Sequence, residues 1–323
     1  MALGASPGID SVPAQAQSCS VIVSAGQSIQ SAIDQASEEA TICLEVGNYE
    51  ENLSIKKSLT LKGRGKDPKE VRITGHEPDR SVIRIESQTE IAVALENLTV
   101  AEVKFTACLV KTSEVICPSG IEVTGRAKTT LSTVQILGNG LGLHVKNSAQ
   151  ANLSDSLLSD NQFGLLLQDS AQASLNKTTL FGNAFGVFTE DSTKISLVDS
   201  TVSMSEFDGL LIQGSSTVEI SSSTVRSNGV TGCEESFQIC NGLTLGDQVK
   251  VTITDSKIEE HPDWGVSALL TVCGYSGDRF TGQVTFKGKN AIQGNNRSRN
   301  QNGKGNPGTH PFADLPDGQV CLP

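Results

Sequence analysis

Aromatic and charged residues are scarce in this chain of 323 residues, at 4% and 19% of the sequence. Gly is frequent and Ser, Thr and Asn dominate the polar residues, which favours many short strands and tight turns over a helical bundle. Lys and Arg are in deficit, and the net charge of −11 argues against a nucleic-acid partner bound through its phosphates. It also weakens the case for a strongly anionic glycan, although a local basic patch could still bind one.

Metal-binding and membrane-spanning patterns are missing as well. The chain has four His and no pair of Cys in C-x-x-C spacing, so we expect no zinc site. No apolar run approaches the roughly 20 residues that cross a bilayer, so we expect no membrane span.

A unit of about two dozen residues recurs through the chain. One glycine marks each unit, at successive steps of 22, 22, 22, 23, 33 and 23 residues. The long step includes Cys233 and Cys240, and a disulfide-closed loop would explain its extra length. The marking glycines are Gly120, Gly142, Gly164, Gly186, Gly209, Gly242 and Gly265.

Apolar residues alternate with polar ones in three short runs within each unit. In one unit the runs contain Leu143 and Val145, then Ala151 and Leu153, and end at Leu158. Three strands of period two, joined by turns, make one coil of a parallel β-helix. A leucine-rich repeat would need a fixed Leu and Asn framework that is absent. We therefore predict an all-β, single-stranded parallel β-helix with about 22–23 residues per coil, whose coils bury their inward faces by stacking.

The two ends of the chain complete this architecture. Residues 26–34 predict a short amphipathic helix, with Ser28 as a candidate N-cap, that would cap the first coil. We expect the β-helix domain to span residues 19–290, with 283–287 as its last strand, and residues 291–323 to form a loop-rich tail. Further strands are expected at 41–46, 53–55, 59–61, 71–73, 82–85, 91–95 and 98–100.

Eight cysteines allow four disulfides. A solenoid keeps neighbours in sequence close together along its axis, so we expect the pairs Cys19–Cys43, Cys108–Cys117, Cys233–Cys240 and Cys273–Cys321, the last tying the tail back. Buried free thiols are the alternative. Disulfides imply an oxidising compartment, so we expect a secreted protein, extracellular or periplasmic. Residues 1–18 lack a signal peptide's apolar core and 13–17 look like a cleavage region, which predicts a flexible remnant left after signal-peptide removal.

Two polar columns recur at fixed positions in the unit. Stacked amides or hydroxyls can hydrogen-bond along the axis, as amides do in cross-β ladders, so we expect both columns to be structural. The first column is Asn139, Asn161 and Asn183, and the second is Ser156, Thr178, Ser200, Ser223 and Ser256.

The segment SIQSAIDQASEEATICLEVGNYEENLSIKKSLTLKGRG, residues 28–65, resembles the opening of the pectin-lyase-like superfamily. A helix, a strand, a G-x-Y-x-E-x-L-x-I coil and an S-L-T-L-x-G coil begin many members. The later units resemble the repeats of NosD-like, carbohydrate-binding and sugar-hydrolase proteins. The resemblance covers residues 20–290 and implies a right-handed parallel β-helix, a fold that hosts lyases, hydrolases, esterases, epimerases, adhesins and non-catalytic binders.

The catalytic motifs of that superfamily are not matched. A pectin methylesterase would use Asp169, but its second motif, at 178–183, lacks its Asp, and Asp169 aligns with the turn residues Asn147 and Asp191. The clustered aspartates of polygalacturonases and the calcium-binding carboxylates of pectate lyases are also not found. We expect no cofactor; calcium is compatible with the fold, but no motif supports it.

Outward side chains on the first strand of each unit would stack about 4.8 Å apart along the axis. Counting two residues from the glycine gives the column Ser54, Arg84, Glu122, His144, Leu166, Phe188, Leu211 and Thr244. Counting four residues gives Lys56, Glu86, Thr124, Lys146, Gln168, Glu190 and Gln213.

Ionisable residues gather in these columns. Glu122 and His144 are candidate catalytic bases or acids, and Arg84 and Lys146 are candidate catalytic cations that hold acidic groups and stabilise a developing anion. Glu86 joins the same cluster. The alternative is a solvated sheet face, on which opposite charges one coil apart favour stacking.

Three large apolar side chains, Leu166, Phe188 and Leu211, lie side by side in the first column. Soluble monomers seldom expose such a stripe, so it would pack under the C-terminal tail, form a homo-oligomer contact or lie against sugar rings. The segments 108–117 and 233–240 both precede the first strand of a repeat unit and would form the walls of a cleft over this sheet. The alternative is that they are surface loops closed by disulfides and have no role in binding.

Two functions stay open. The first is a secreted carbohydrate-active enzyme, a polysaccharide lyase or glycoside hydrolase that acts on the outer face of the first sheet. The second is a non-catalytic module for glycan binding or adhesion on the same face. Both imply a polysaccharide or glycan partner, and an ice-binding role is a distant third because the outer columns are mixed. The candidate substrate-binding residues are Glu86, Leu166, Gln168, Phe188 and Glu190.

Overall fold

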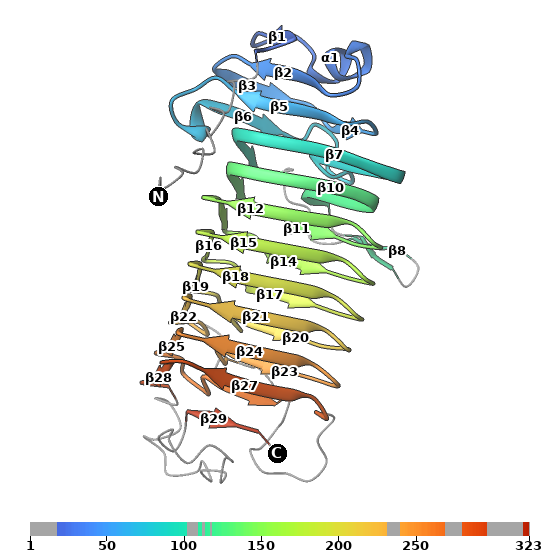
Figure 1. The fold of residues 1–323 in the computed structure, drawn as a ribbon. Helices are drawn as coiled ribbons and strands as arrows, with labels where there is room; N and C mark the ends of the chain where they lie inside the picture. Colours follow the sequence, from blue (N-terminus) through green and yellow to red (C-terminus); the bar gives the residue numbers. More distant parts are fainter. Residues whose placement is uncertain are drawn as a thin grey trace, which may run out of the picture.

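A computed structural model gives the fold, and it describes residues 18–101, 109–111, 114–116, 118–230, 240–268, 280–295 and 319–322. Apart from one small antiparallel hairpin, its strands form a continuous parallel array of 27 strands, in which each strand pairs with the strand one coil away. The array winds around the axis and so divides into three faces, called here the first, second and third sheets. It forms the elongated solenoid of Figure 1. The predicted all-β parallel β-helix is therefore confirmed.

Three strands make each coil, so the solenoid has three faces. The first sheet carries the outward columns predicted from the sequence. It contains β4 (Leu53–Ile55), the first parts of β7 (Ile83–Ala101) and β10 (Ser119–Leu137), β11 (Leu141–Val145), β14 (Phe163–Leu167), β17 (Phe185–Thr189), β20 (Leu210–Ile212), β23 (Leu243–Leu245), β26 (Val266–Ala268) and β29 (Val320–Cys321).

The strands β7 and β10 run through all three faces without a break. The second sheet adds β1 (Val21–Val23), β2 (Ala40–Leu44), β5 (Leu59–Gly63), β12 (Gln150–Ser154), β15 (Gln172–Asn176), β18 (Lys194–Val198), β21 (Thr217–Ser221), β24 (Lys250–Thr254) and β27 (Gln283–Lys287). The third sheet adds β3 (Gly47–Glu50), β6 (Val71–Thr74), β13 (Leu157–Ser159), β16 (Thr179–Phe181), β19 (Thr201–Ser203), β22 (Thr224–Arg226), β25 (Lys257–Glu259) and β28 (Ala291–Gln293).

Alternation along the strands builds the core. In β12, Ala151 and Leu153 point inward and are buried while the residues between them face out. At the marking glycines the coils come very close: a Cβ added to Gly142 would lie 2.5 Å from the carbonyl oxygen of Gly164. A larger residue at this position would separate the coils, which is why glycine marks the repeat.

A short helix, α1 (Ile29–Gln35), caps the first coils. Ser28 is its N-cap, as predicted, and its Oγ accepts the N–H of Ser31 at 3.1 Å. Glu51 also accepts the N–H groups of Ile29 and Gln30, at 2.7 and 3.1 Å. This carboxylate satisfies helix donors that the N-cap leaves open. A 3₁₀ turn, η1 (Pro68–Glu70), precedes β6.

The solenoid continues past the boundary expected at residue 290. β28 pairs with β25, and β29 pairs with β26, so two strands of the segment 291–323 extend the stack. The sequence missed β28 because the Asn- and Gly-rich sequence around it is typical of a loop, and it missed β29 because Gln319 stands in place of the repeat glycine. Residues 1–17 lie outside the described part, so the flexible remnant stays a prediction.

The disulfide Cys19–Cys43 is present, as predicted, with a Cα–Cα distance of 5.6 Å. Cys240 and Cys321 are also disulfide-bonded, and no described cysteine is free. The other three predicted pairs stay predictions, since each includes a residue outside the described part: Cys108, Cys117, Cys233 or Cys273.

The amide ladder is real and longer than predicted. Asn139 donates its backbone N–H to Asn161 Oδ1 at 2.9 Å, and Asn161 does the same to Asn183 at 3.0 Å. The hydroxyl of Ser205, the next residue in this position, has no hydrogen-bond partner among the described residues, and the ladder resumes from the N–H of Ser205 through Asn228, His261, Asn295 and Gln319. The hydroxyl ladder is confirmed too, with Ser200 Oγ accepting the N–H of Thr178 at 3.1 Å. Among the described residues, no helix is long and apolar enough to cross a membrane.

Candidate functional site

The first sheet aligns the predicted outward column one residue per coil. Parallel pairing places Glu122 opposite both Arg84 and His144, and Leu166 opposite both His144 and Phe188. The same register continues to Ser54 at one end and to Leu211 and Thr244 at the other. Residue counting alone therefore placed this column correctly.

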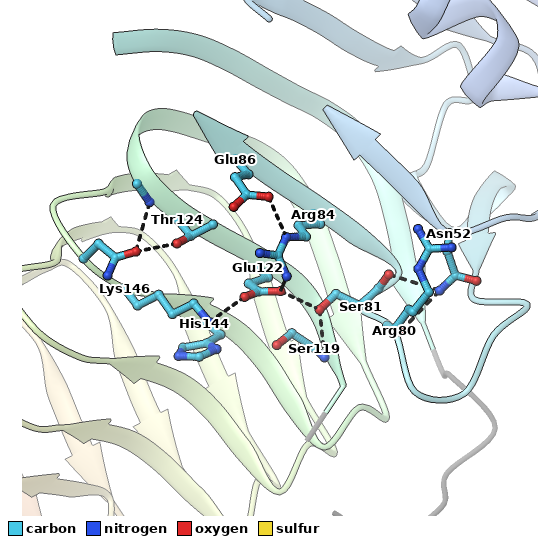
Figure 2. A network of polar contacts seen from close by, with 12 residues as sticks. Asn52, Arg80, Ser81, Arg84, Glu86, Ser119, Glu122, Thr124, His144 and Lys146 are labelled. Atoms are coloured by element: carbon cyan, nitrogen blue, oxygen red, sulfur yellow. Dashed lines mark hydrogen bonds and ion pairs between the residues drawn. The ribbon is translucent and has the colours of Figure 1, made fainter. Parts of the chain in front are cut away.

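Glu122 is the centre of an ion-pair network, drawn in Figure 2. Its side chain is nearly buried, and its Oε1 lies 2.8 Å from Lys146 Nζ. Its Oε2 lies 3.3 Å from an Arg84 guanidinium nitrogen and accepts the hydroxyl of Ser81 at 3.1 Å. Arg84 also donates to Glu86 Oε2, at 3.1 Å. The carboxylate of Glu122 thus lies between two cations.

These partners keep Glu122 ionised. Burial alone would raise its pKa, but the hydrogen bond and charge of Lys146, with the charge of Arg84, outweigh burial and lower the pKa. The pKa of Arg84 is raised, chiefly by its hydrogen bond to Glu86. Glu122 is therefore suited to act as a fixed negative charge and poorly suited to donate a proton.

His144 is held neutral beside this network. Burial lowers its pKa, and the hydrogen bond to Gln168 only partly offsets that effect. Gln168 Nε2 donates to Glu190 at 2.7 Å, so its Oε1 must face His144 Nε2, 2.7 Å away. Because that oxygen can only accept, His144 carries its proton on Nε2. The lone pair is then on Nδ1, the ring nitrogen that could accept a proton.

A groove of about 840 Å³ runs over this sheet. All four predicted catalytic residues line it, as do Leu166, Gln168, Phe188 and Glu190 of the predicted substrate-binding set. Glu86 is a partner of Arg84 and is not one of the lining residues. The structure adds lining residues that the sequence did not single out, including Asp79, Arg80, Ser81, Leu141 and Phe163.

Leu141 and Phe163 could have been found, because they hold the same place directly before the repeat glycine. Ser81 could not, because it precedes the regular part of the repeat.

Aromatic side chains form a stack at the other end of the groove. The ring of Phe163 lies 5.3 Å from that of Phe185 and 5.6 Å from that of Phe188, and Phe185 lies 5.0 Å from Phe207. Of the apolar stripe, only Phe188 takes part in this stack, through its contact with Phe163. The prediction that the C-terminal tail covers the apolar stripe concerns residues 296–318, which lie outside the described part.

The two predicted walls are only partly described. β8 (Leu109–Lys111) and β9 (Glu114–Ile116) form a small antiparallel hairpin within the first insertion. Residues 231–239 of the second insertion lie outside the described part. The walls therefore stay a prediction.

The sequence matches the family described as "Right handed beta helix region" over residues 103–296. The chain belongs to this right-handed β-helix family. No curated protein matches the sequence.

This right-handed β-helix resembles solved structures at low sequence identity. Pectate lyase Pel9A is 16% identical, over 85% of this chain and 71% of that one, with a TM-score of 0.52. Pectin methylesterase PemA from Erwinia chrysanthemi is 15% identical, over 76% and 80%, with a TM-score of 0.49. The A-module of mannuronan C-5 epimerase AlgE4 from Azotobacter vinelandii is 12% identical, over 83% and 92%, with a TM-score of 0.43. The likeness to pectate lyase Pel9A agrees with the right-handed β-helix fold that the family match shows, and the activity has to be argued from the residues of the site.

Asp169 of this β-helix is a turn residue, which agrees with rejecting the esterase motif. It has a φ of 60°, and its Oδ2 accepts the backbone N–H of Asn147 at 2.8 Å. Asp191 accepts the N–H of Asp169 in the same way. In the part of the chain that the structure describes, no three His, Cys, Asp or Glu side chains cluster as a metal site.

Proposed function

We propose that this protein binds a polysaccharide along the groove of its first sheet. The observation that carries the proposal is the groove itself, which combines buried polar groups with an apolar end over successive coils. Its volume of about 840 Å³ is typical of ligand sites. The coil spacing of about 4.8 Å is close to the length of one hexose unit, so a linear glycan could meet one coil per sugar.

Secretion is part of this proposal. Four described disulfide-bonded positions, Cys19, Cys43, Cys240 and Cys321, support folding in an oxidising compartment, extracellular or periplasmic. A polysaccharide ligand would be met in such a place. The structural relatives include a pectate lyase, which agrees with a carbohydrate ligand.

A pair of phenylalanine variants tests glycan binding. Phe188→Ala opens the groove floor, and we expect it to weaken binding of the glycan found in a panel by about tenfold or more. Phe181→Ala is the matched control, because Phe181 is an exposed phenylalanine of β16 on the third sheet. It should bind as the wild type does. Titration calorimetry measures both, and a panel without any binder, or equal loss in both variants, would contradict the proposal.

The second candidate is an enzyme in the same groove, a polysaccharide lyase or glycoside hydrolase. The neutral imidazole of His144, with Nδ1 free of its proton, is the observation that favours a lyase base. A hydrolase is less well supported, because it needs a protonated carboxyl group and Glu122 is driven toward ionisation. If His144→Ala loses turnover but keeps glycan binding, the enzyme is supported; if no glycan in the panel gives a product, this candidate fails.

A further inference from the structure

The cations of the groove are already occupied. Among the described lining residues, three carry positive charge: Arg80, Arg84 and Lys146. Arg84 and Lys146 both bind Glu122, and Arg80 binds Glu77 at 2.9 Å on the surface. Asp79, Glu122 and Glu190 supply three negative charges in return, so the lining has no excess of cations.

Glu122 lies where an acidic ligand would need to bind. Recognition of a sugar carboxylate uses charge-assisted hydrogen bonds from Arg and Lys. Here Glu122 takes those bonds, at 2.8 Å from Lys146 and 3.3 Å from Arg84. A uronate would either have to displace this nearly buried side chain, which Ser81 also holds at 3.1 Å, or lie against it. The second arrangement places like charges together, which is strongly unfavourable at an interface.

Hydroxyl groups of a neutral sugar meet no such obstacle. The groove is lined by His144, Gln168 and Glu190, whose uncharged or negative polar groups can bond hydroxyl groups, and by Leu166 and Phe188 as an apolar surface. We propose that Glu122 is a specificity-determining residue, which fills the space between Arg84 and Lys146 and so reserves the groove for neutral polysaccharides against polyuronates. This inference rests on the proposed glycan-binding function and adds the class of ligand to it.

One chemical consequence concerns the enzyme candidate. Elimination by a lyase removes the proton beside a sugar carboxyl group, so it requires a uronate. A groove that rejects uronates has no substrate for that reaction. Neutral selectivity therefore favours the binding function over the lyase.

The test compares hexasaccharides of one length, neutral (glucose, mannose, xylose or galactose) and uronic (galacturonic or mannuronic acid), by titration calorimetry at low and high salt. The wild type should bind at least one neutral series, with little salt dependence, and bind uronates at least about tenfold more weakly. Glu122→Gln keeps the size of the side chain and removes its charge. The ratio of its uronate affinity to its neutral-glycan affinity should rise about tenfold or more over that of the wild type, and high salt should remove this gain.

Glu96→Gln is the matched control, because Glu96 is an ion-paired glutamate, 2.9 Å from Lys62, in the second-sheet part of β7. It should leave both affinities unchanged, and circular dichroism should show native folding in both variants. Wild type that binds uronates as tightly as neutral glycans overturns the inference while the proposed function stands. Unchanged uronate affinity in Glu122→Gln overturns the role of Glu122. A wild type that binds neither class overturns the proposed function and the inference with it.

Discussion

Two buried ionisable residues, Asp208 and His261, should make the free energy of unfolding change with pH in opposite directions. Asp208 is fully buried and accepts the N–H of Asn241 at 2.8 Å, and burial raises its pKa from 3.8 to about 7. The nearby carboxyl group of Asp263 raises it further. His261 is also fully buried, and burial lowers its pKa from 6.5 to about 4 although Glu260 lies nearby.

The signs follow from linkage. Asp208 holds a proton that the unfolded chain releases, so its contribution is fully present below pH 3.8 and is lost as the pH rises toward 7. His261 stays neutral where the unfolded chain is charged, so its contribution is present above pH 6.5 and is lost as the pH falls toward 4. Between pH 4 and 6.5 the two contributions oppose each other.

Removing one of these ionisable groups should leave the pH dependence of the other visible in the free energy of unfolding. In Asp208→Asn, the free energy of unfolding should rise with pH from 4 to 6.5; in His261→Asn, it should fall with pH from 4 to 7. Asn fits position 261 because the amide ladder has Asn at equivalent positions. Urea unfolding across this pH range gives the slopes. Parallel profiles for the wild type and both variants would show that these groups do not titrate as described.

For single residues, the sequence predicted where each side chain lies on the sheet better than it predicted the contacts and burial of that side chain. Counting from the glycine placed Glu122, His144 and Leu166 in one column, because a parallel sheet keeps equivalent residues in register. It could not show that Ser81 and Lys146 close around Glu122, since those contacts depend on side-chain conformation. The burial of Asp208 could not be predicted from the sequence either, because residues of the neighbouring coils cover this side chain.

The amide ladder acts on whole strands. Asn161, nearly buried, accepts the N–H of Asn139 through Oδ1 and donates through Nδ2 to the carbonyl of Ile136, at 3.1 Å. A buried polar group that loses its partner costs about 1–3 kcal/mol. Each such rung therefore bonds a backbone N–H at a turn and a carbonyl group of the strand that precedes that turn.

Asn161→Ala should lower the free energy of unfolding by about 2–4 kcal/mol, because it leaves the N–H of Asn139 and the carbonyl of Ile136 without this partner. Asn152→Ala, on the exposed face of β12, is the control and should change it by less than about 0.5 kcal/mol. Urea unfolding followed by circular dichroism gives both values. An equal loss in the two variants would mean that the ladder adds no stability of its own.

The sequence predicted only the first three members of this ladder. One extra residue between Ser205 and Gly209 and the long insertion before Asn241 shift the count, and chemically different residues fill the same place from Ser205 onward. His261 accepts through a ring nitrogen where the earlier coils use an amide oxygen, at 3.2 Å from the N–H of Asn228. Geometry is conserved along the stack while residue type is not, so a search for repeated Asn stops early.

For the molecule as a whole, the fold was the most predictable feature, because each coil repeats the same alternation of apolar residues. A wrong strand assignment in one coil therefore does not alter the assignments in the others. The groove was less predictable because it depends on where insertions lie and on side chains from the irregular coils before Gly120. The charge balance that separates neutral from acidic ligands becomes visible only when Arg84, Glu122 and Lys146 are seen as partners.

A solenoid in which coils contact only their neighbours should tolerate removal of one complete coil. Deleting residues 164–185 joins Phe163 to Gly186 and preserves the register, because Phe163 and Phe185 pair as equivalent residues of adjacent coils. We expect a folded, shorter protein with native β-sheet circular dichroism and cooperative urea unfolding. Deleting residues 164–174, half a coil, brings the first sheet against the second and exchanges buried for exposed positions, so it should not fold. If both deletions unfold, or both fold, stability does not reside in the coil as a unit.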